Sequence, residues 1–378
     1  ADAARRTQMA GFDGVEIHGA HGYLLCQFLS PYSNHRNDMY GGDLNSRARM
    51  PLETVDRVRS TVGKDYPIFY RFSAEEYVPG GLTIEETRRF AQMLEEAGVD
   101  CLHVSVGNFS SIHKFVPPIY FDHGYFTYLA EEIKKAVNIP VIAVGAISEP
   151  EHANWLIQQG KADFVSMGRA LIADPHLPNK AREGRLDEIR PCIRCNEGCI
   201  NRFFKGWTMR CAVNPQCGRE VHYGKITEAD TPAKVLVAGG GPAGMEAALV
   251  SAQRGHHVTL CEQQSELGGW LKEVAVPSYK YDIKRLLDNL RFEVYHHPNI
   301  DIRVNTEVTP ELVREMKPDI VFVAAGSRSS MPDFPGSDRF NVVDGIEVYA
   351  GRQEVGHKIV VAGGGLLGCE VAVKLAKQ

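Results

Sequence analysis

The sequence predicts an α/β protein: an incomplete parallel (β/α)8 barrel followed by Rossmann-like units. Three observations support this prediction. Short apolar runs alternate with helical stretches from residue 14 to 168, four cysteines crowd into residues 192–211, and two glycine-rich fingerprints follow. The chain has 378 residues, which is enough for two or three domains. We expect the barrel strands and helices in residues 1–190 and the cysteine segment with a linker in residues 191–232. A Rossmann-like domain is expected in residues 233–330, and the start of a second one in residues 331–378.

The first 190 residues favour a barrel over a doubly wound sheet. Five strand–helix units are visible, and a barrel of eight units needs about 250 residues, so we expect the first three units upstream of residue 1. Polar residues end nearly every strand, on the face where barrels keep their chemistry. The expected strands are Val15–His18, Ile68–Ser73, Cys101–Gly107, Val141–Gly145 and Phe164–Gly168, and the helices are Arg47–Val62, Ile84–Ala97, Tyr125–Val137 and Glu151–Gln159.

His18 ends the first expected strand, and His21 and Tyr23 follow it in the next loop. The two imidazoles resemble half of a metal site, but no Asp or Glu in the loop completes it. Two interpretations stay open. The residues are either ordinary polar loop residues, or a pair of hydrogen-bond donors aimed at one substrate oxygen with Tyr23 as the proton source.

Later strands of the barrel carry features of a flavin site. Arg71 lies inside a strand, where burial demands an anionic partner: either an internal salt bridge or the electron-rich edge of a flavin. Gly145 and Gly168 follow the last two strands, and barrels often bind phosphate there. Arg169 would add a charge-assisted contact. These residues predict a phosphate site, with plain turn glycines as the alternative.

The cysteines Cys192, Cys195, Cys199 and Cys211 have the spacing C-x2-C-x3-C-x11-C. Compact thiolate sets hold soft metals or iron–sulfur clusters. Zinc is the alternative, but zinc ribbons usually use two separated pairs, whereas three cysteines are crowded together here. Cys217 is a weaker candidate for the fourth ligand. An iron–sulfur cluster between two cofactor-binding domains would relay electrons.

The first fingerprint, Gly239-x-Gly241-x-x-Gly244, follows an apolar strand and opens a helix. The next strand ends at Glu262, close to the separation of about 20 residues that is typical of dinucleotide sites. The glycines let main-chain amides approach a pyrophosphate, and Glu262 can accept from both ribose hydroxyls. Gly269 belongs to a later Gly-Gly pair that indicates a loop near the same dinucleotide.

The second fingerprint, Gly363-x-Gly365-x-x-Gly368, predicts an NAD(P)H site with its own strand and helix. The residue that would separate NADH from NADPH falls beyond Gln378, so this preference stays open. Both ends of the sequence read as helix interiors, which indicates a fragment.

Composition narrows the function classes. The net charge is −5 with acids and bases interspersed, and no basic stripe or basic amphipathic helix indicates a nucleic acid or a membrane as partner. Apolar runs are too short to span a bilayer. Nine cysteines, four of them clustered, do not form a secreted disulfide framework. We therefore expect a reducing, cytoplasmic location.

Residues 11–31 (GFDGVEIHGAHGYLLCQFLSP) and 34–50 (NHRNDMYGGDLNSRARM) resemble the active-site region of the old yellow enzyme family. The resemblance continues through the cysteines and both fingerprints. It is to the multi-cofactor branch, which includes 2,4-dienoyl-CoA reductase, 2-enoate reductase, bile-acid-type NADH:flavin oxidoreductases and trimethylamine dehydrogenase. It implies an FMN-bearing barrel, one [4Fe–4S] cluster, an FAD domain and an NAD(P)H domain.

The resemblance also implies residue roles. His18 and His21 would polarise a substrate carbonyl, Tyr23 would donate a proton, and Arg71 would contact the FMN ring. Gly145, Gly168 and Arg169 would contact the FMN phosphate, the four cysteines would bind the cluster, and Gly239, Gly241, Gly244 and Glu262 would bind FAD.

Two departures favour a simple enone or enoate substrate. The dienoyl-CoA reductases that we compare lack the His-x-x-His pair and place a catalytic histidine earlier than His113 stands here. Trimethylamine dehydrogenase has tyrosine in place of His18. The expected activity is NAD(P)H-dependent reduction of an activated C=C bond in a small molecule, with electrons passing through FAD and the cluster to FMN. The alternatives are amine dehydrogenation and an electron-transfer subunit with a dormant barrel.

Overall fold

The computed structural model describes residues 1–377 and consists of two compact units. The first unit contains residues 1–182 and 194–212, and the second contains residues 183–193 and the chain from 213 onward. Gln378, the last residue of the predicted NAD(P)H segment, lies outside the described residues. None of the helices within residues 1–377 combines the length and the apolar character needed to cross a membrane.

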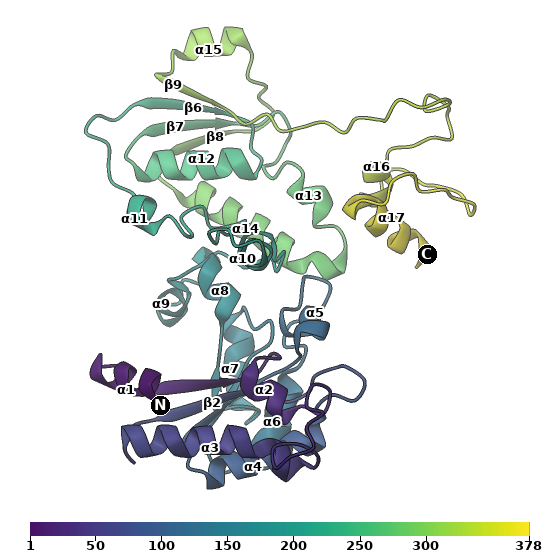
Figure 1. Cartoon of the computed structure of the whole chain (residues 1–378). Coiled ribbons are helices and arrows are strands. Elements are labelled where there is room, and N and C mark those ends of the chain that lie inside the picture. Colours follow the sequence, from purple (N-terminus) through teal and green to yellow (C-terminus); the bar gives the residue numbers. More distant parts are fainter. Residues whose placement is uncertain (378) are drawn as a thin grey trace. The chain divides into compact units, whose positions relative to one another are not determined.

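The first unit is built on one parallel sheet, of which Figure 1 labels β2. Its strands pair in the order β1-β2-β3-β4-β5. Strands that follow one another without a reversal form the wall of a barrel, whereas a doubly wound sheet reverses its order at a switch point. The predicted barrel class is therefore confirmed. The strands are β1 (Val15–Gly19), β2 (Ile68–Ser73), β3 (Cys101–Ser105), β4 (Val141–Ala143) and β5 (Phe164–Val165).

Helices separate these strands, as predicted. The longest, α3 (Leu44–Val62), begins three residues earlier than expected because Asp43 caps it by accepting from the Ser46 main-chain N–H at 2.8 Å. The others are α1 (Asp2–Met9), α2 (Leu24–Leu29), α4 (Ile84–Glu96), α5 (Ile112–Phe115), α6 (Thr127–Lys134), α7 (Pro150–Gln158), α8 (Gly168–Ala173), α9 (Leu177–Arg182) and α10 (Arg202–Phe204), with short turns η1 (Phe109–Ser111) and η3 (Glu197–Asn201).

The two faces of this sheet differ in polarity, because successive side chains of a strand point to opposite faces. One face carries the buried core residues Ile17, Tyr70, Phe72, Leu102 and Val104. The other face carries Glu16 and His18 on β1, Arg71 on β2 and His103 on β3. The register places His18 opposite Arg71, and Arg71 opposite His103. This second face, the polar face, presents titratable side chains from three neighbouring strands.

The second unit contains a four-stranded parallel sheet in the order β8-β7-β6-β9. Its order reverses beside β6, which is the switch point where Rossmann-like sheets bind dinucleotides. The strands are β6 (Lys234–Ala238), β7 (His257–Cys261), β8 (Ile300–Arg303) and β9 (Ile320–Val323); the helices are α11 (Glu220–Tyr223), α12 (Pro242–Gln253), α13 (Leu271–Val274), α14 (Tyr281–His296), α15 (Pro310–Met316), α16 (Gly345–Tyr349) and α17 (Leu366–Ala376), with turns η2 (Leu186–Glu188) and η4 (Ser278–Lys280).

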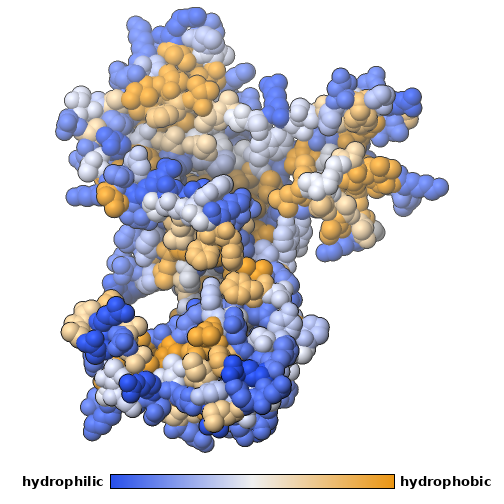
Figure 2. All heavy atoms as spheres, in the orientation of Figure 1, coloured by the Kyte–Doolittle hydropathy of each residue, from blue (hydrophilic) through white to orange (hydrophobic). Residues whose placement is uncertain are grey.

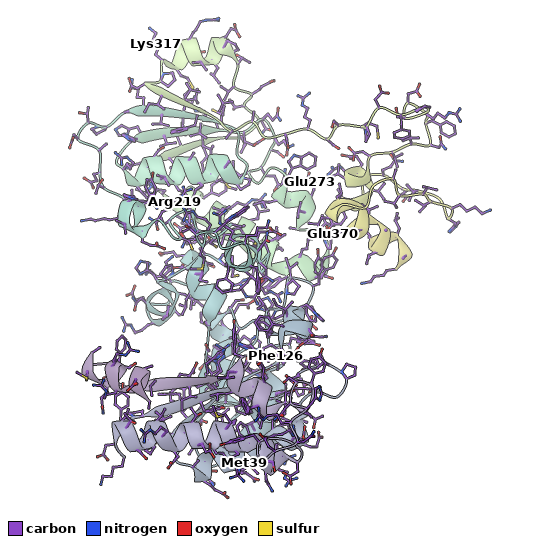
Figure 3. The ribbon with its side chains drawn as sticks, viewed as in Figure 1. Met39, Phe126, Arg219, Glu273, Lys317 and Glu370 are labelled. Atoms are coloured by element: carbon purple, nitrogen blue, oxygen red, sulfur yellow. The ribbon has the colours of Figure 1, made fainter. Side chains whose placement is uncertain are left out.

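The strand predicted before the second fingerprint does not form, although its helix does, as α17. A strand requires a neighbour for its N–H and C=O groups, and within residues 1–377 no strand pairs with residues 358–362. An ion pair holds α17: Lys280 Nζ lies 2.6 Å from Oε2 of Glu370 on α17, and both side chains are 7% exposed. Glu370 is labelled in Figure 3.

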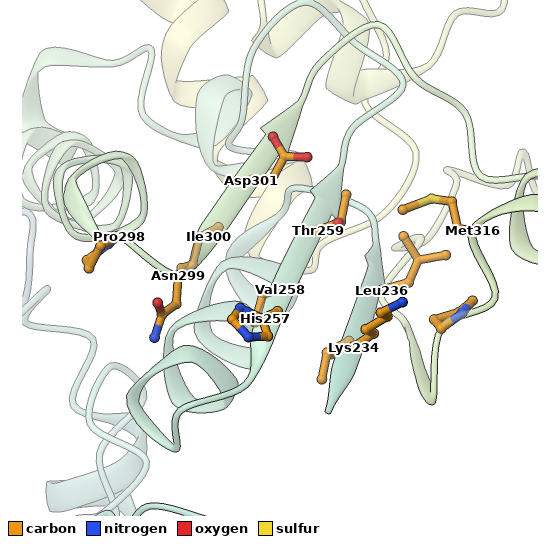
Figure 4. A pocket seen from close by; sticks show the side chains of 12 residues that line it. Lys234, Leu236, His257, Val258, Thr259, Pro298, Asn299, Ile300, Asp301 and Met316 are labelled. Atoms are coloured by element: carbon orange, nitrogen blue, oxygen red, sulfur yellow. The ribbon is translucent and has the colours of Figure 1, made fainter. Parts of the chain in front are cut away.

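The surface over the second sheet is apolar. Figure 2 shows hydrophobic side chains gathered there, and all four residues of β9 are exposed. A cavity of about 520 Å³ opens at the amino ends of β6, β7 and β8, beside Lys234, His257 and Asn299 (Figure 4). The fingerprint glycines follow the opposite, carboxyl end of β6. The cavity is therefore separate from the dinucleotide crevice.

Candidate active site

His18, His21 and Tyr23 gather at the carboxyl end of β1. The His18 ring centroid lies 5.3 Å from that of His21 and 5.2 Å from that of Tyr23. Tyr23 is the residue that precedes α2 and is 45% exposed. The structure thus brings together the three residues that the sequence analysis singled out, while their catalytic roles stay predictions.

His21 is held from three directions. Its main-chain N–H donates to Ser73 Oγ at 3.0 Å, its Nε2 lies 2.7 Å from Ser105 Oγ, and its ring stacks on Phe115 at a centroid distance of 4.6 Å. These contacts hold the residue at φ 62°, a conformation that a residue other than glycine rarely adopts. Neither serine was predicted from the sequence. The sequence signal that could have indicated them is that each serine ends a strand. In the structure the two serines are register partners on β2 and β3.

The two histidines are neutral near pH 7. Burial, and then the positive charge of Arg71, lower the pKa of His21 to about 3. The same two causes lower the pKa of His18, against the opposing charge of Glu16. A neutral imidazole carries one N–H donor and one acceptor nitrogen. The pair can therefore donate hydrogen bonds to an oxygen without first binding protons.

The lowered pKa of His21 predicts how the stability of the protein depends on pH. In the unfolded chain, His21 binds a proton below its ordinary pKa of 6.5, whereas in the folded protein its pKa is about 3. The contribution of neutral His21 to the free energy of unfolding is thus fully present above pH 6.5. It is lost as the pH falls, by up to about 1.4 kcal/mol per pH unit. Replacing His21 with asparagine, which does not titrate, is expected to flatten this dependence. Urea unfolding between about pH 7 and about pH 5 measures it.

The matched control for this test is His113→Asn, because His113 is exposed on α5. That variant is expected to keep the pH dependence of the wild-type protein. If His21→Asn kept it as well, His21 would not be a buried neutral imidazole.

Arg71 forms no internal salt bridge among the described residues. Glu16, its nearest acidic neighbour on the polar face, pairs with His103 Nδ1 at 2.8 Å instead. Burial would raise the pKa of Glu16, but its hydrogen bond and charge interaction with His103, helped by Arg71 and His18, lower it. Arg71 Nε is buried and has no hydrogen-bond partner within residues 1–377. A buried guanidinium N–H of this kind fits an electron-rich ligand edge.

The predicted phosphate residues lie in the loops after β4 and β5. Gly145 has φ 136°, and a Cβ there would lie 3.0 Å from the ring of Phe126 (labelled in Figure 3), so only glycine fits without strain. Gly168 begins α8. Arg169 Nη1 donates to Pro117 O at 2.9 Å and to Asn196 Oδ1 at 2.7 Å. The Arg169 side chain therefore lies against the cysteine segment, and its phosphate contact stays a prediction.

Three of the predicted cluster cysteines lie together in the first unit. Arg210 N donates to Gly198 O at 2.8 Å, which brings Cys211 next to Cys199. Burial chiefly raises the pKa of Cys199; the Cys195 and Cys211 thiols raise it further, while Arg169 acts in the opposite direction. Cys192 and Cys217 belong to the second unit.

The grouped cysteines do not form a closed metal site in the described part of the chain. No set of three or more His, Cys, Asp or Glu side chains in residues 1–377 has the arrangement of such a site. The grouped thiols are nevertheless the donor type that soft metals and iron–sulfur clusters take. The cluster therefore remains a prediction that the donor chemistry fits.

The first fingerprint forms a tight glycine turn between β6 and α12. Gly239 has φ 113°, and a Cβ on Gly244 would lie 1.8 Å from Gly239 O. Gly241 precedes the first residue of α12. A Cβ on Gly269 would lie 3.1 Å from the Gly241 Cα, so the loop that contains Gly269 reaches this turn. The arrangement leaves main-chain amides open to a pyrophosphate.

Glu262 has a structural task that the sequence analysis missed. Its carboxylate accepts from Gly240 N at 2.7 Å and from Gln264 N at 2.8 Å, and the residue is 6% exposed. It thereby ties the end of β7 to the glycine turn. A carboxylate has about four acceptor positions, so contacts to ribose hydroxyls stay possible and remain a prediction.

The second fingerprint repeats the geometry of the first. Gly363 has φ 116°, a Cβ on Gly368 would lie 2.0 Å from Gly363 O, and Gly365 precedes α17. The residues therefore fit a second dinucleotide, even though the preceding strand is not formed.

Replacing Gly244 with alanine is expected to disrupt the predicted FAD site. The new Cβ would meet main-chain atoms that have no room to move, so the turn must open. We expect FAD affinity to fall by roughly tenfold or more, as measured by flavin release on dilution. The control is Gly356→Ala, because a Cβ at Gly356 meets no atom within 4 Å. Equal FAD retention in both variants would contradict the role of the turn.

Two known protein families match successive parts of the chain. Residues 1–188 match the NADH:flavin oxidoreductase / NADH oxidase family. Residues 233–378 match the pyridine nucleotide-disulphide oxidoreductase family. The first match covers the strands that carry the histidine loop, and the second covers both glycine fingerprints. FMN-binding and FAD/NAD(P)-binding domains therefore lie in this order along the chain.

Individual relatives match along nearly the whole chain. An NADH oxidase of Thermoanaerobacter brockii is 48% identical over all of this chain and 58% of its own length. A cinnamate reductase of Clostridium sporogenes is 39% identical over all of this chain and 58% of its own length. The solved structure of a 2-naphthoyl-CoA reductase complex is 34% identical, with a TM-score of 0.94 over 99% of this chain and 57% of that one.

The chain thus spans little more than half the length of these relatives. Within that span, the barrel wall, the crowded cysteines and both fingerprints follow one another along the chain. The chain belongs to the multi-cofactor branch of the old yellow enzyme family.

Proposed function

We propose that this chain is part of an NAD(P)H-dependent flavin and iron–sulfur oxidoreductase that reduces an activated C=C bond of a small molecule. The observation that carries the proposal is the neutral pair His18 and His21, which lies beside Tyr23 at the carboxyl end of β1. The similarity to an NADH oxidase and to a cinnamate reductase supports it. The cysteine usage supports a reducing, cytoplasmic location.

Four groups would serve this reaction: FMN at Arg71 and the loops of Gly145 and Gly168, a [4Fe–4S] cluster at the four cysteines, FAD at the first fingerprint, and NADH or NADPH at the second. When bound, they supply hydride transfer and one-electron transfer. Arg71 would hold the pyrimidine edge of FMN through its buried N–H, because that donor has no partner among the described residues.

The chain's own residues would handle the charge that develops on the substrate. As a hydride adds to the β-carbon of an enone or enoate, negative charge collects on the carbonyl or carboxylate oxygen. His18 and His21 would each donate an N–H to that oxygen, and donors of this kind act most strongly in a buried site. Tyr23 would then deliver a proton to the α-carbon.

The test is reoxidation of the reduced flavin by candidate substrates in stopped flow. Cinnamate and a simple enone are expected to reoxidise it rapidly, and an acyl-CoA substrate more slowly, because the residue pattern departs from the dienoyl-CoA reductases. Flavin reduction by dimethylamine would instead support the amine dehydrogenase alternative. No reaction with any of these compounds would favour an electron-transfer subunit with a dormant barrel.

A further inference from the structure

We propose that Ser105 is a positioning residue that holds His21 as the tautomer with its proton on Nδ1. Ser105 is the last residue of β3, and its hydroxyl oxygen lies 2.7 Å from His21 Nε2. Either atom of this pair can act as the donor, since a hydroxyl both donates and accepts. The direction of the bond decides which ring nitrogen of His21 keeps a proton.

Burial decides the direction of the bond. Ser105 is 1% exposed, and His21 Nε2 is the single partner of its hydroxyl among residues 1–377. If Nε2 carried the proton, Ser105 would accept, and its own hydroxyl proton would be buried without an acceptor. An unmade bond of a buried donor costs about 1–3 kcal/mol. If Ser105 donates to Nε2, its proton is satisfied and no buried donor is left over.

The ring geometry supports one fixed arrangement. His21 stacks on Phe115 with an interplanar angle of 18°, and its main-chain N–H is anchored on Ser73. Ser73 and Ser105 are register partners on β2 and β3, so neighbouring strands hold the main chain and the side chain of the same histidine. With Nε2 accepting from Ser105, Nδ1–H is the one donor that the neutral ring has left.

This inference deepens the proposed function and rests on it in one respect. A donor for a substrate oxygen requires an N–H at Nδ1, and Ser105 would provide it by selecting the tautomer. The tautomer itself is a property of the protein without substrate, so it can be measured whether or not the proposed reaction occurs.

The experiment is nuclear magnetic resonance of the intact protein labelled with 15N in histidine. Long-range proton–nitrogen correlations distinguish an Nδ1–H ring from an Nε2–H ring. The chain has 14 histidines, so the signals of His21 are identified by their loss in His21→Gln. We expect His21 to be the Nδ1–H tautomer in the wild type, and Ser105→Ala to shift it toward Nε2–H. Ser105→Thr keeps the hydroxyl and is expected to restore Nδ1–H.

Ser73→Ala is the matched control. It removes the serine that binds the main chain of His21, so it is expected to lower stability without changing the ring tautomer. In turnover, Ser105→Ala is expected to lower kcat by roughly tenfold to a hundredfold through misplacement of the donor, with Ser105→Thr close to wild type and KM little changed.

The outcomes separate the two proposals. An Nε2–H ring in the wild type would overturn the inference, and so would an Nδ1–H ring that persists in Ser105→Ala. If both serine variants failed to fold, the wild-type tautomer would still decide between the two bond directions. An Nδ1–H ring that depends on Ser105, in a protein that reduces no enone or enoate, would support the inference and reject the proposed function.

Discussion

Replacing Cys199 with serine is expected to leave FAD reducible by NAD(P)H while reduction of FMN by NAD(P)H is lost. Cys199 lies with Cys195 and Cys211 in the first unit, and a serine hydroxyl is a poor ligand for iron. Loss of a residue that merely supports a metal ligand already costs about 10- to 100-fold in metal affinity. Loss of the ligand thiolate is expected to cost more, so iron content should fall below about one tenth of the wild-type value.

Two measurements check this expectation: iron and sulfide content, and stopped-flow spectra that follow the two flavins separately. Cys217→Ser is the matched control. Cys217 is buried, lies six positions after Cys211 in the sequence, and is the competing candidate for the fourth ligand. It should keep the cluster, whereas Cys211→Ser should lose it. The reverse result would make Cys217 the fourth ligand. Full FMN reduction in a Cys199→Ser protein that contains no iron would show that the cluster is not a bridge for electrons.

Local patterns were sufficient to predict much of the fold. The strands of the barrel wall are short apolar runs between helices, and their sequential order follows from repetition of one unit. The glycine turns were also predictable, because Gly239 and Gly244 must approach each other within a few residues of sequence. In both cases the information lies close together along the chain.

Features that depend on distant residues were not predictable in this way. His21 and Ser105 are 84 positions apart, and Arg169 and Asn196 are 27 apart; only the fold brings them together. The prediction of a strand before Gly363 was wrong for the same reason, because a strand needs a pairing partner from elsewhere in the chain. Glu262 was predicted to bind ribose hydroxyls, but its bond to Gly240 could not be predicted, because it depends on the packed turn.

Replacing both His18 and His21 with alanine is expected to slow the reduction of enones and enoates at least about a hundredfold while FMN stays bound. Each imidazole would stabilise the same developing oxygen charge, and removing one donor of this kind costs about 3 kcal/mol, or roughly a hundredfold in kcat. Because both act on one atom, the two losses are not independent, and the double variant is expected to lose between about 10² and 10⁴ in kcat.

The control for this variant is His113→Ala, which removes an exposed imidazole from α5 nearby in the same unit. It is expected to reduce the substrate at nearly the wild-type rate. The measurement is single-turnover reoxidation of the reduced flavin, with FMN content determined in parallel, because loss of flavin would also lower the rate. If the double variant retained its rate within a few-fold with FMN bound, the two histidines would be polar loop residues.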